Sequence, residues 1–205
     1  FKPTQGLIPI SGALTFSHTL DQAGIFTRSV EDAAYLAAAL AEEGSPPLPA
    51  RCARATPPVL AAVKTPVWGQ AEEHARQQFR RDIETLRAAG ATVEERELPE
   101  PFSKAHGTIR TIMAAESALN LGQLVRDKTP LMSATLRDFV AEGEGVGALA
   151  YLQAVAHRLS LQEELERFLA GYDAVITPPT TGEAPAGLQQ TGNPAFCSIW
   201  SLCGV

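Results

Sequence analysis

The residues most able to do chemistry are the four histidines, and they are scattered along the chain. They stand at His18, His74, His106 and His157, and no two share the i, i+4 spacing of a helical zinc site. His74 and His157 fall within predicted helices beside charged neighbours, which favours a structural role over a catalytic one. The sequence therefore predicts no metal ion and no bound cofactor.

The candidate nucleophiles are equally isolated. No serine lies in a G-x-S-x-G elbow, and no S-x-x-K motif occurs. Cys197 lies between Phe196 and Trp200, an apolar setting that disfavours a reactive thiolate. With Cys52 and Cys203 it forms neither a disulfide set nor a zinc spacing, which favours a reducing, cytoplasmic location. We predict no catalytic residue from these side chains alone.

Composition and charge argue against two classes of partner. The chain has 205 residues, of which 17 are basic and 23 acidic, and its formal charge of −6 disfavours nucleic acid and anionic membrane surfaces. No apolar run reaches the roughly 18 residues that cross a bilayer. With 45% apolar and 20% charged residues, the chain is expected to form one substantial core. The apolar runs at Phe1 and at residues 202–205 lead us to expect a fragment of a longer chain.

Hydrophobic periodicity predicts a βαβ unit in the middle of the chain. Residues 59–63 form a short apolar run suited to a buried strand, and residues 71–89 form an amphipathic helix that ends at Gly90. Residues 91–98 return as a strand, so the two strands should be parallel. No glycine-rich phosphate loop follows the first strand, which argues against nucleotide binding. A further buried strand is expected at 174–177, and the predicted fold class is α/β.

The other elements are mostly helices. A hydroxyl at Ser29 followed by an acid at Asp32 gives a capping-box-like start to a helix over residues 29–42. Its closely packing face is expected to be rich in alanine and to consist of Val30, Ala33, Ala34, Ala37 and Leu40. Residues 44–58 hold five prolines and predict a linker. Residues 101–171 are mainly helical, in segments near 103–126, 131–142 and 147–170. The last segment carries an apolar stripe that we expect to face the core, namely Leu149, Leu152, Ala156, Leu159, Leu165 and Leu169.

Two stretches of this sequence resemble the amidase signature family. The first begins with FKPTQG at residues 1–6 and continues with LDQAG at 20–24 and FTRSVEDAA at 26–34, which match motifs of the family in the same order. The second is DAVITPPT at 173–180, followed by TGNPAFCSIWSLCGV at 191–205, and it is similar to the C-terminal part of the family. The βαβ unit between them also fits, so the resemblance spans nearly the whole chain.

The resemblance implies an activity whose catalytic residues are not in this chain. Members of the family hydrolyse amide bonds with a serine nucleophile, a bridging serine held through a cis peptide, and a lysine base. These residues would lie upstream of residue 1, because Lys2 matches the KPT motif and not the base. Residues 1–205 would then be the C-terminal portion of a single amidase domain. Its central sheet would be mixed, flanked by helices and completed by the missing N-terminal half.

The resemblance also implies partners and a substrate pocket. The partner would be a small-molecule amide, with no nucleic acid or membrane involved, and a homodimer is a further option. The loop and helix start that face the acyl pocket in the family correspond here to Thr191, Gly192, Asn193, Phe196 and Trp200. Phe196 and Trp200 have an equal alternative as core aromatics. Many relatives carry an aspartate at the position of Asn193 to hold a substrate amino group, so Asn193 argues against a glutamine-like substrate.

Two alternative functions stay open at this point. The chain could belong to a protein like the amidase-type subunit of an amidotransferase, or to a non-catalytic scaffold or binding domain of the same fold. A serine-rich G-S-[ST]-x-G-G loop and an upstream lysine in the complete sequence would support hydrolysis, and their absence would support the scaffold.

Overall fold

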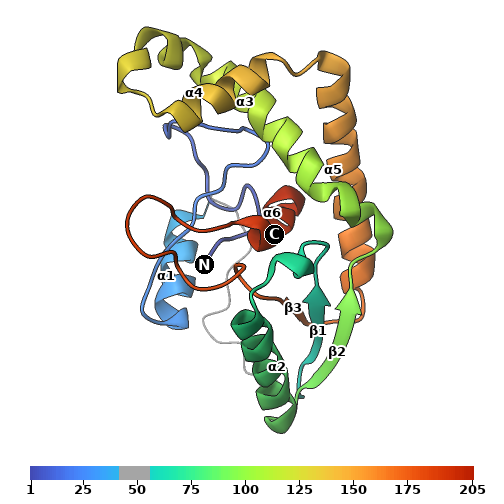
Figure 1. Ribbon diagram of the computed structural model, residues 1–205. Coiled ribbons are helices and arrows are strands. Elements are labelled where there is room, and N and C mark those ends of the chain that lie inside the picture. The colour runs from blue at the N-terminus through green and yellow to red at the C-terminus, as the bar shows by residue number, and fades with distance from the viewer. Residues whose placement is uncertain (42–55) are drawn as a thin grey trace. The chain divides into compact units, whose positions relative to one another are not determined.

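The computed structural model describes residues 1–41 and 56–205, so most of the predicted linker at 44–58, together with Cys52, lies outside the described residues. The chain divides into two compact units. Residues 1–53, 107–158 and 204–205 make up the first unit, and residues 54–106 and 159–203 make up the second. Short 3-10 helices stand at Trp68–Gln70, Glu100–Lys104 and Thr129–Leu131. The longer elements are, in order (Figure 1), α1 Val30–Leu40, β1 Val59–Lys64, α2 Glu73–Ala88, β2 Thr92–Glu97, α3 Ala105–Asp127, α4 Ala134–Glu144, α5 Ala148–Leu169, β3 Ala174–Ile176 and α6 Ala195–Cys203.

The second unit is built on a three-stranded parallel sheet in the order β2-β1-β3. Residues 60–63 of the central strand β1 are all buried, as expected for a parallel strand with a neighbour on each side. Helix α2 connects β1 to β2 and packs Phe79 and Ile83 into one cluster with Leu60 and Val93 (Figure 1). The predicted parallel βαβ unit and the α/β fold class are therefore confirmed.

The first unit contains a helix crossing at backbone contact. Val125 of α3 and Val140 of α4 belong to one buried cluster, and Phe16 packs against it. Gly143 of α4 lies directly on the backbone of α3, because a Cβ at this position would stand 1.9 Å from the carbonyl oxygen of Ala114. Only glycine fits at this crossing.

A buried carboxylate, Glu116 of α3, also ties the first unit together. It is 5% exposed and accepts hydrogen bonds from Ser17 Oγ at 2.5 Å, the Thr19 backbone N–H at 2.9 Å, Thr19 Oγ1, and the Tyr151 hydroxyl at 2.6 Å. Burial by itself raises the pKa of Glu116, but the hydrogen bonds from Ser17, Thr19 and Tyr151 outweigh it, so this pKa lies below its ordinary value. The ionised carboxylate thus joins the N-terminal segment, α3 and α5.

Helix α5 buries a different face from the predicted one. Four of the six residues expected to face the core are exposed, namely Leu149, Leu152, Ala156 and Leu159. Of the six, only Leu165 is buried. The rotation of the helix follows its polar contacts, since Tyr151 reaches Glu116 and the His157 ring Nδ1 lies 2.7 Å from Thr108 Oγ1. The spacing of apolar residues predicted the wrong face, because it contains no information about these polar contacts with α3.

Helix α1 begins as predicted but buries little of its surface. Ser29 Oγ accepts a hydrogen bond from the Asp32 N–H at 3.1 Å, which confirms the predicted N-terminal cap. The predicted packing face is right in its alanines, because Ala37 is buried and Ala33 and Ala34 are half-buried, and wrong at its two ends, because Val30 is 82% and Leu40 is 47% exposed. Among the residues of α1 only Ala37 is buried.

We expect the 205-residue chain on its own to self-associate and to bind a hydrophobic dye. The outer edges of β2 and β3 have no neighbouring strand in the described sheet, and open edges promote association. Exposed apolar side chains add to this tendency; they include Phe26, Val30, Tyr35, Leu119, Leu149 and Leu188. Dye fluorescence and light scattering after gel filtration measure both properties. A monodisperse monomer that melts cooperatively and binds no dye would contradict the expectation.

Candidate functional site

The predicted substrate-binding residues lie in the second unit, on the segment that follows β3. Thr177 comes directly after this strand, and its Oγ1 donates to the carbonyl oxygen of Val63 at 3.1 Å. The segment therefore leaves the sheet at the carboxyl ends of the strands, where ligands of parallel α/β sheets commonly bind. It continues through residues 177–194 into α6. Its three predicted binding residues, Thr191, Gly192 and Asn193, are exposed.

Asn193 is the most highly connected of these residues. Its Oδ1 accepts a hydrogen bond from the Ala195 backbone N–H at 3.0 Å, at the first residue of α6. Its Nδ2 donates to Gln70 Oε1 at 3.2 Å, and its carbonyl oxygen accepts from Thr180 Oγ1, also at 3.2 Å. The preceding Gly192 has a φ of +98°, a conformation that side-chain-bearing residues rarely adopt. The hydrogen bonds with Thr180 and Ala195 and the positive φ of Gly192 thus fix the backbone conformation around Asn193.

Phe196 and Trp200 lie on α6 and are more enclosed than the loop. Phe196 is completely buried and packs edge-on against Trp68, with ring centroids 6.5 Å apart. Trp200 is partly buried, and its indole N–H has no hydrogen-bond partner among the described residues. The structure therefore places Phe196 in the core of this unit, whereas Thr191, Gly192 and Asn193 are exposed. The pocket role of both aromatics stays a prediction.

A cleft of about 500 Å³ lies between α2 and the beginning of the same loop. Its lining combines the apolar Phe79 with the polar or charged side chains of His74, Arg81, Asp82 and Glu183. The five predicted binding residues are not among those that line it. The site inferred from the sequence is therefore the surface formed by the loop and α6, and the cleft borders that loop on its α2 side.

The described residues contain no cluster of histidine, cysteine and acidic side chains arranged to hold a metal ion. Neither Cys197 nor Cys203 takes part in a disulfide, and the Cys197 thiol donates to the carbonyl oxygen of Pro179 at 2.9 Å. Within the same described ranges, no helix is both long and apolar enough to cross a membrane.

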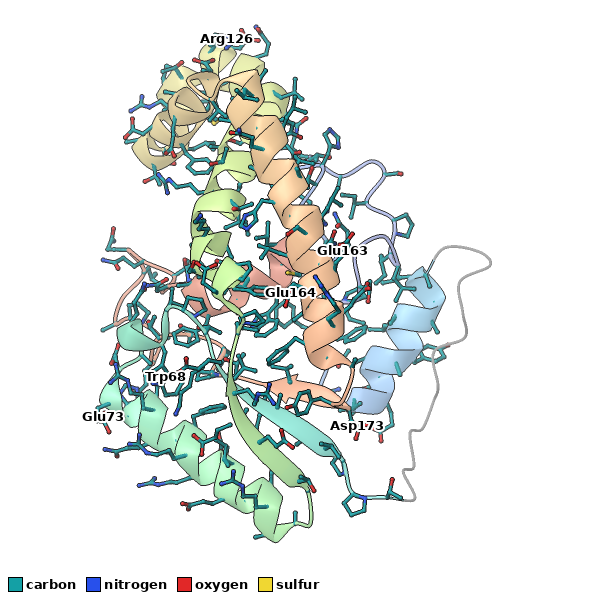
Figure 2. All side chains as sticks on the ribbon, turned by 90° about the vertical axis from the view of Figure 1, so that its right-hand side faces the viewer. Trp68, Glu73, Arg126, Glu163, Glu164 and Asp173 are labelled. Carbon is teal, nitrogen blue, oxygen red and sulfur yellow. The ribbon has the colours of Figure 1, made fainter. Side chains whose placement is uncertain are left out.

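The sequence did not point to two residues that support the loop, Trp68 and Gln70. Both lie in the short 3-10 helix Trp68–Gln70, which comes just before α2. Figure 2 labels Trp68 and also Glu73, the first residue of α2. Trp68 contacts Phe196, and Gln70 binds Asn193 although the two stand 123 positions apart. No local pattern pairs residues at that separation, so only the folded chain reveals this support.

Comparisons with known proteins identify the family. The family model described as Amidase matches residues 1–203. The 2-amino-5-chloromuconic acid deaminase of Comamonas testosteroni is 28% identical over 220 residues, an alignment that covers 100% of this chain and 47% of that protein. The A-type subunit of the glutamyl-tRNA(Gln) amidotransferase of Exiguobacterium sibiricum is also 28% identical, over 90% of this chain and 45% of its own length. This chain belongs to the amidase family, as its motifs indicated.

Solved structures show the same fold. A crystal structure described as an amidase matches with a TM-score of 0.84 at 28% identity and covers 99% of this chain and 48% of its own. Fatty acid amide hydrolase shares the fold with a TM-score of 0.77 at 18% identity, over 99% of this chain and 39% of its own. This chain spans about half the length of the curated relatives that it matches.

Proposed function

We propose that this chain is part of an amide-bond hydrolase and supplies a substrate-binding surface of that enzyme. The observation that carries the proposal is the family match over residues 1–203. The proposed serine nucleophile, bridging serine and lysine base belong to the N-terminal half of the same domain. Below, "full-length protein" means the polypeptide that contains that half together with this chain.

The proposed division of labour follows from the chemistry of amide hydrolysis. A serine hydroxyl is a weak nucleophile until a base takes its proton, and the developing oxyanion needs hydrogen-bond donors close by. Residues 191–193 include no basic side chain that could take this proton. The loop at residues 191–193 and Trp200 would instead contact the part of the substrate that does not react, and such contacts hold the carbonyl in place for attack.

A panel of amides tests the proposal. We expect the full-length protein to hydrolyse aryl or aliphatic amides with a neutral acyl part, because Asn193 offers an amide where a carboxylate would attract an ammonium group. A protein that cleaves no amide in the panel would favour the scaffold alternative instead.

The likeness to one subunit of an amidotransferase supports a second candidate function. In this case the substrate would be glutamine, and hydrolysis would depend on other subunits. Preferential release of ammonia from glutamine over the simple amides of the same panel would favour this candidate over the first.

Truncating Trp200 to alanine in the full-length protein is expected to lower kcat/KM for a bulky amide about tenfold to a hundredfold. An aromatic contact of this kind is worth roughly 1.5–3 kcal/mol, and the loss appears in kcat/KM. A small amide such as acetamide should lose much less, because it does not reach the ring. If Trp200 is a core residue, its loss costs about 3–5 kcal/mol of stability. Equal losses for both amides, together with a large drop in Tm, would therefore contradict the pocket role.

A further inference from the structure

Two neighbouring parts of one stretch of chain hold the loop after β3 in place, and both are distant from the loop in the sequence. The first is the short helix Trp68–Gln70, whose Gln70 Oε1 accepts a hydrogen bond from Asn193 Nδ2 at 3.2 Å. The second is the beginning of α2, where the Glu72 backbone N–H donates to the carbonyl oxygen of Thr181 at 2.7 Å. The loop is thus attached to one short stretch of chain near both of its ends, at Thr181 and at Asn193.

Between these two attachments the loop is largely exposed. Residues 183–192 are all exposed, and Gly187 and Gly192 have positive φ angles. At the first attachment the fit is close, because a Cβ on Gly182 would stand 2.5 Å from the carboxylate of Glu72. At the second attachment the contact is a hydrogen bond between two side chains. Residues 191–193 are therefore held by Thr180, whose Oγ1 donates to the Asn193 carbonyl oxygen, and by Gln70, which binds the Asn193 side chain from outside the loop.

The contact with Gln70 also reaches α6. The same Asn193 amide that donates to Gln70 through Nδ2 accepts from the Ala195 N–H through Oδ1. A planar amide cannot turn one of these atoms without turning the other. Gln70 and the Ala195 N–H therefore jointly set the orientation of the amide group that begins the helix carrying Trp200.

We propose that Gln70 is a positioning residue for substrate binding: it orients Asn193 and so holds residues 191–193 and the start of α6 in their binding arrangement. This inference rests on the proposed amide hydrolase. Gln70 acts through Asn193 and touches no reacting atom. Its loss should weaken substrate binding and leave the chemical step nearly intact.

The first test compares Gln70→Met and Gln70→Glu in the full-length protein. Both variants keep the length of the side chain, but only glutamate keeps an acceptor for Asn193 Nδ2. For an amide that the wild type hydrolyses, Gln70→Met should raise KM about three- to tenfold, the equivalent of one hydrogen bond, with kcat changed less than twofold. Gln70→Glu should stay within about twofold of the wild-type KM. Equal KM values for the two variants, or a loss confined to kcat, would overturn the proposal.

The matched control is Gln123→Met on α3. Gln123 is exposed, donates to Asp127 Oδ1 at 2.8 Å and accepts from Arg126 at 3.3 Å, so this change also removes the side-chain hydrogen bonds of a surface glutamine, two in this case. It should leave KM unchanged. An increase in KM equal to that of Gln70→Met would show a nonspecific effect and overturn the proposal.

Hydrogen exchange of the same proteins gives a readout that does not depend on activity. Peptides covering residues 179–197 should exchange several-fold faster in Gln70→Met than in the wild type, and at the wild-type rate in Gln70→Glu and Gln123→Met. Unchanged exchange in Gln70→Met would overturn the positioning role even if the protein is an active amidase. Faster exchange in a protein that hydrolyses no amide would instead show that the proposed function, and not the loop support, has failed.

Discussion

Replacing Gly143 with alanine should lower the free energy of unfolding of the full-length protein by at least about 3 kcal/mol. Overpacking a core usually costs 1–3 kcal/mol, and here the new Cβ would stand 1.9 Å from the backbone oxygen of Ala114. A backbone carbonyl cannot rotate away as a side chain can, so α3 and α4 must move apart. That movement opens the cluster that contains Val125 and Val140. Urea unfolding followed by circular dichroism measures the loss.

Gly107→Ala on α3 is the control for this change. Gly107 is an exposed helical glycine, and a Cβ added there would meet nothing within 4 Å. Alanine should therefore stabilise the helix by about 0.5–1 kcal/mol through its lower conformational entropy cost. The two substitutions are chemically identical and should have effects of opposite sign. A neutral or stabilising Gly143→Ala would show that the two helices do not cross at backbone contact.

Glu116→Gln should cost about 3 kcal/mol, although the side chain keeps its shape. The carboxylate accepts hydrogen bonds from four donors, and the glutamine NH2 would point a donor at some of them. The Thr19 N–H cannot rotate to become an acceptor, and Ser17 is 1% exposed, so water does not replace the lost partner. Leaving buried groups of this kind without partners costs 1–3 kcal/mol, and more where a charge takes part.

The contribution of Glu116 should also depend on pH. Because its pKa is lower in the folded chain than in the unfolded one, it stabilises the fold fully above the unfolded pKa of about 4.3. This stabilisation is lost as the pH falls through the lower, folded pKa. The difference in stability between wild type and Glu116→Gln should therefore shrink in acid, whereas replacement of the exposed Glu166 by glutamine should change the stability little at pH 7. A constant difference between pH 7 and pH 3 would contradict this explanation.

Much of the fold could be predicted because local patterns determine it. The apolar run at residues 59–63, the amphipathic helix ending before Gly90 and the strand after it became β1, α2 and β2 in parallel order. The buried face of α5 could not be predicted, because it depends on contacts of Tyr151 and His157 with another helix. The crossing at Gly143 was equally hidden, since a glycine near the end of a helix ordinarily indicates termination.

The candidate site, like the fold, could be predicted from the sequence only where it depends on a local pattern. Its loop residues could be proposed because TGNPAF is a contiguous motif, and in the structure Asn193 accepts a hydrogen bond from the first residue of α6. The support from Gln70 was not found, because it joins residues 123 positions apart that carry no shared pattern. The burial of Phe196 likewise depends on Trp68, from the opposite half of the sequence.

The proposed division of labour is tested most directly by acylation with an activated ester such as p-nitrophenyl acetate, with the modified residue located by mass spectrometry. We predict that the full-length protein forms an acyl-serine outside residues 1–205 and that the 205-residue chain alone forms none. An acyl group on a serine within residues 1–205, or turnover of amides by this chain alone, would contradict the account.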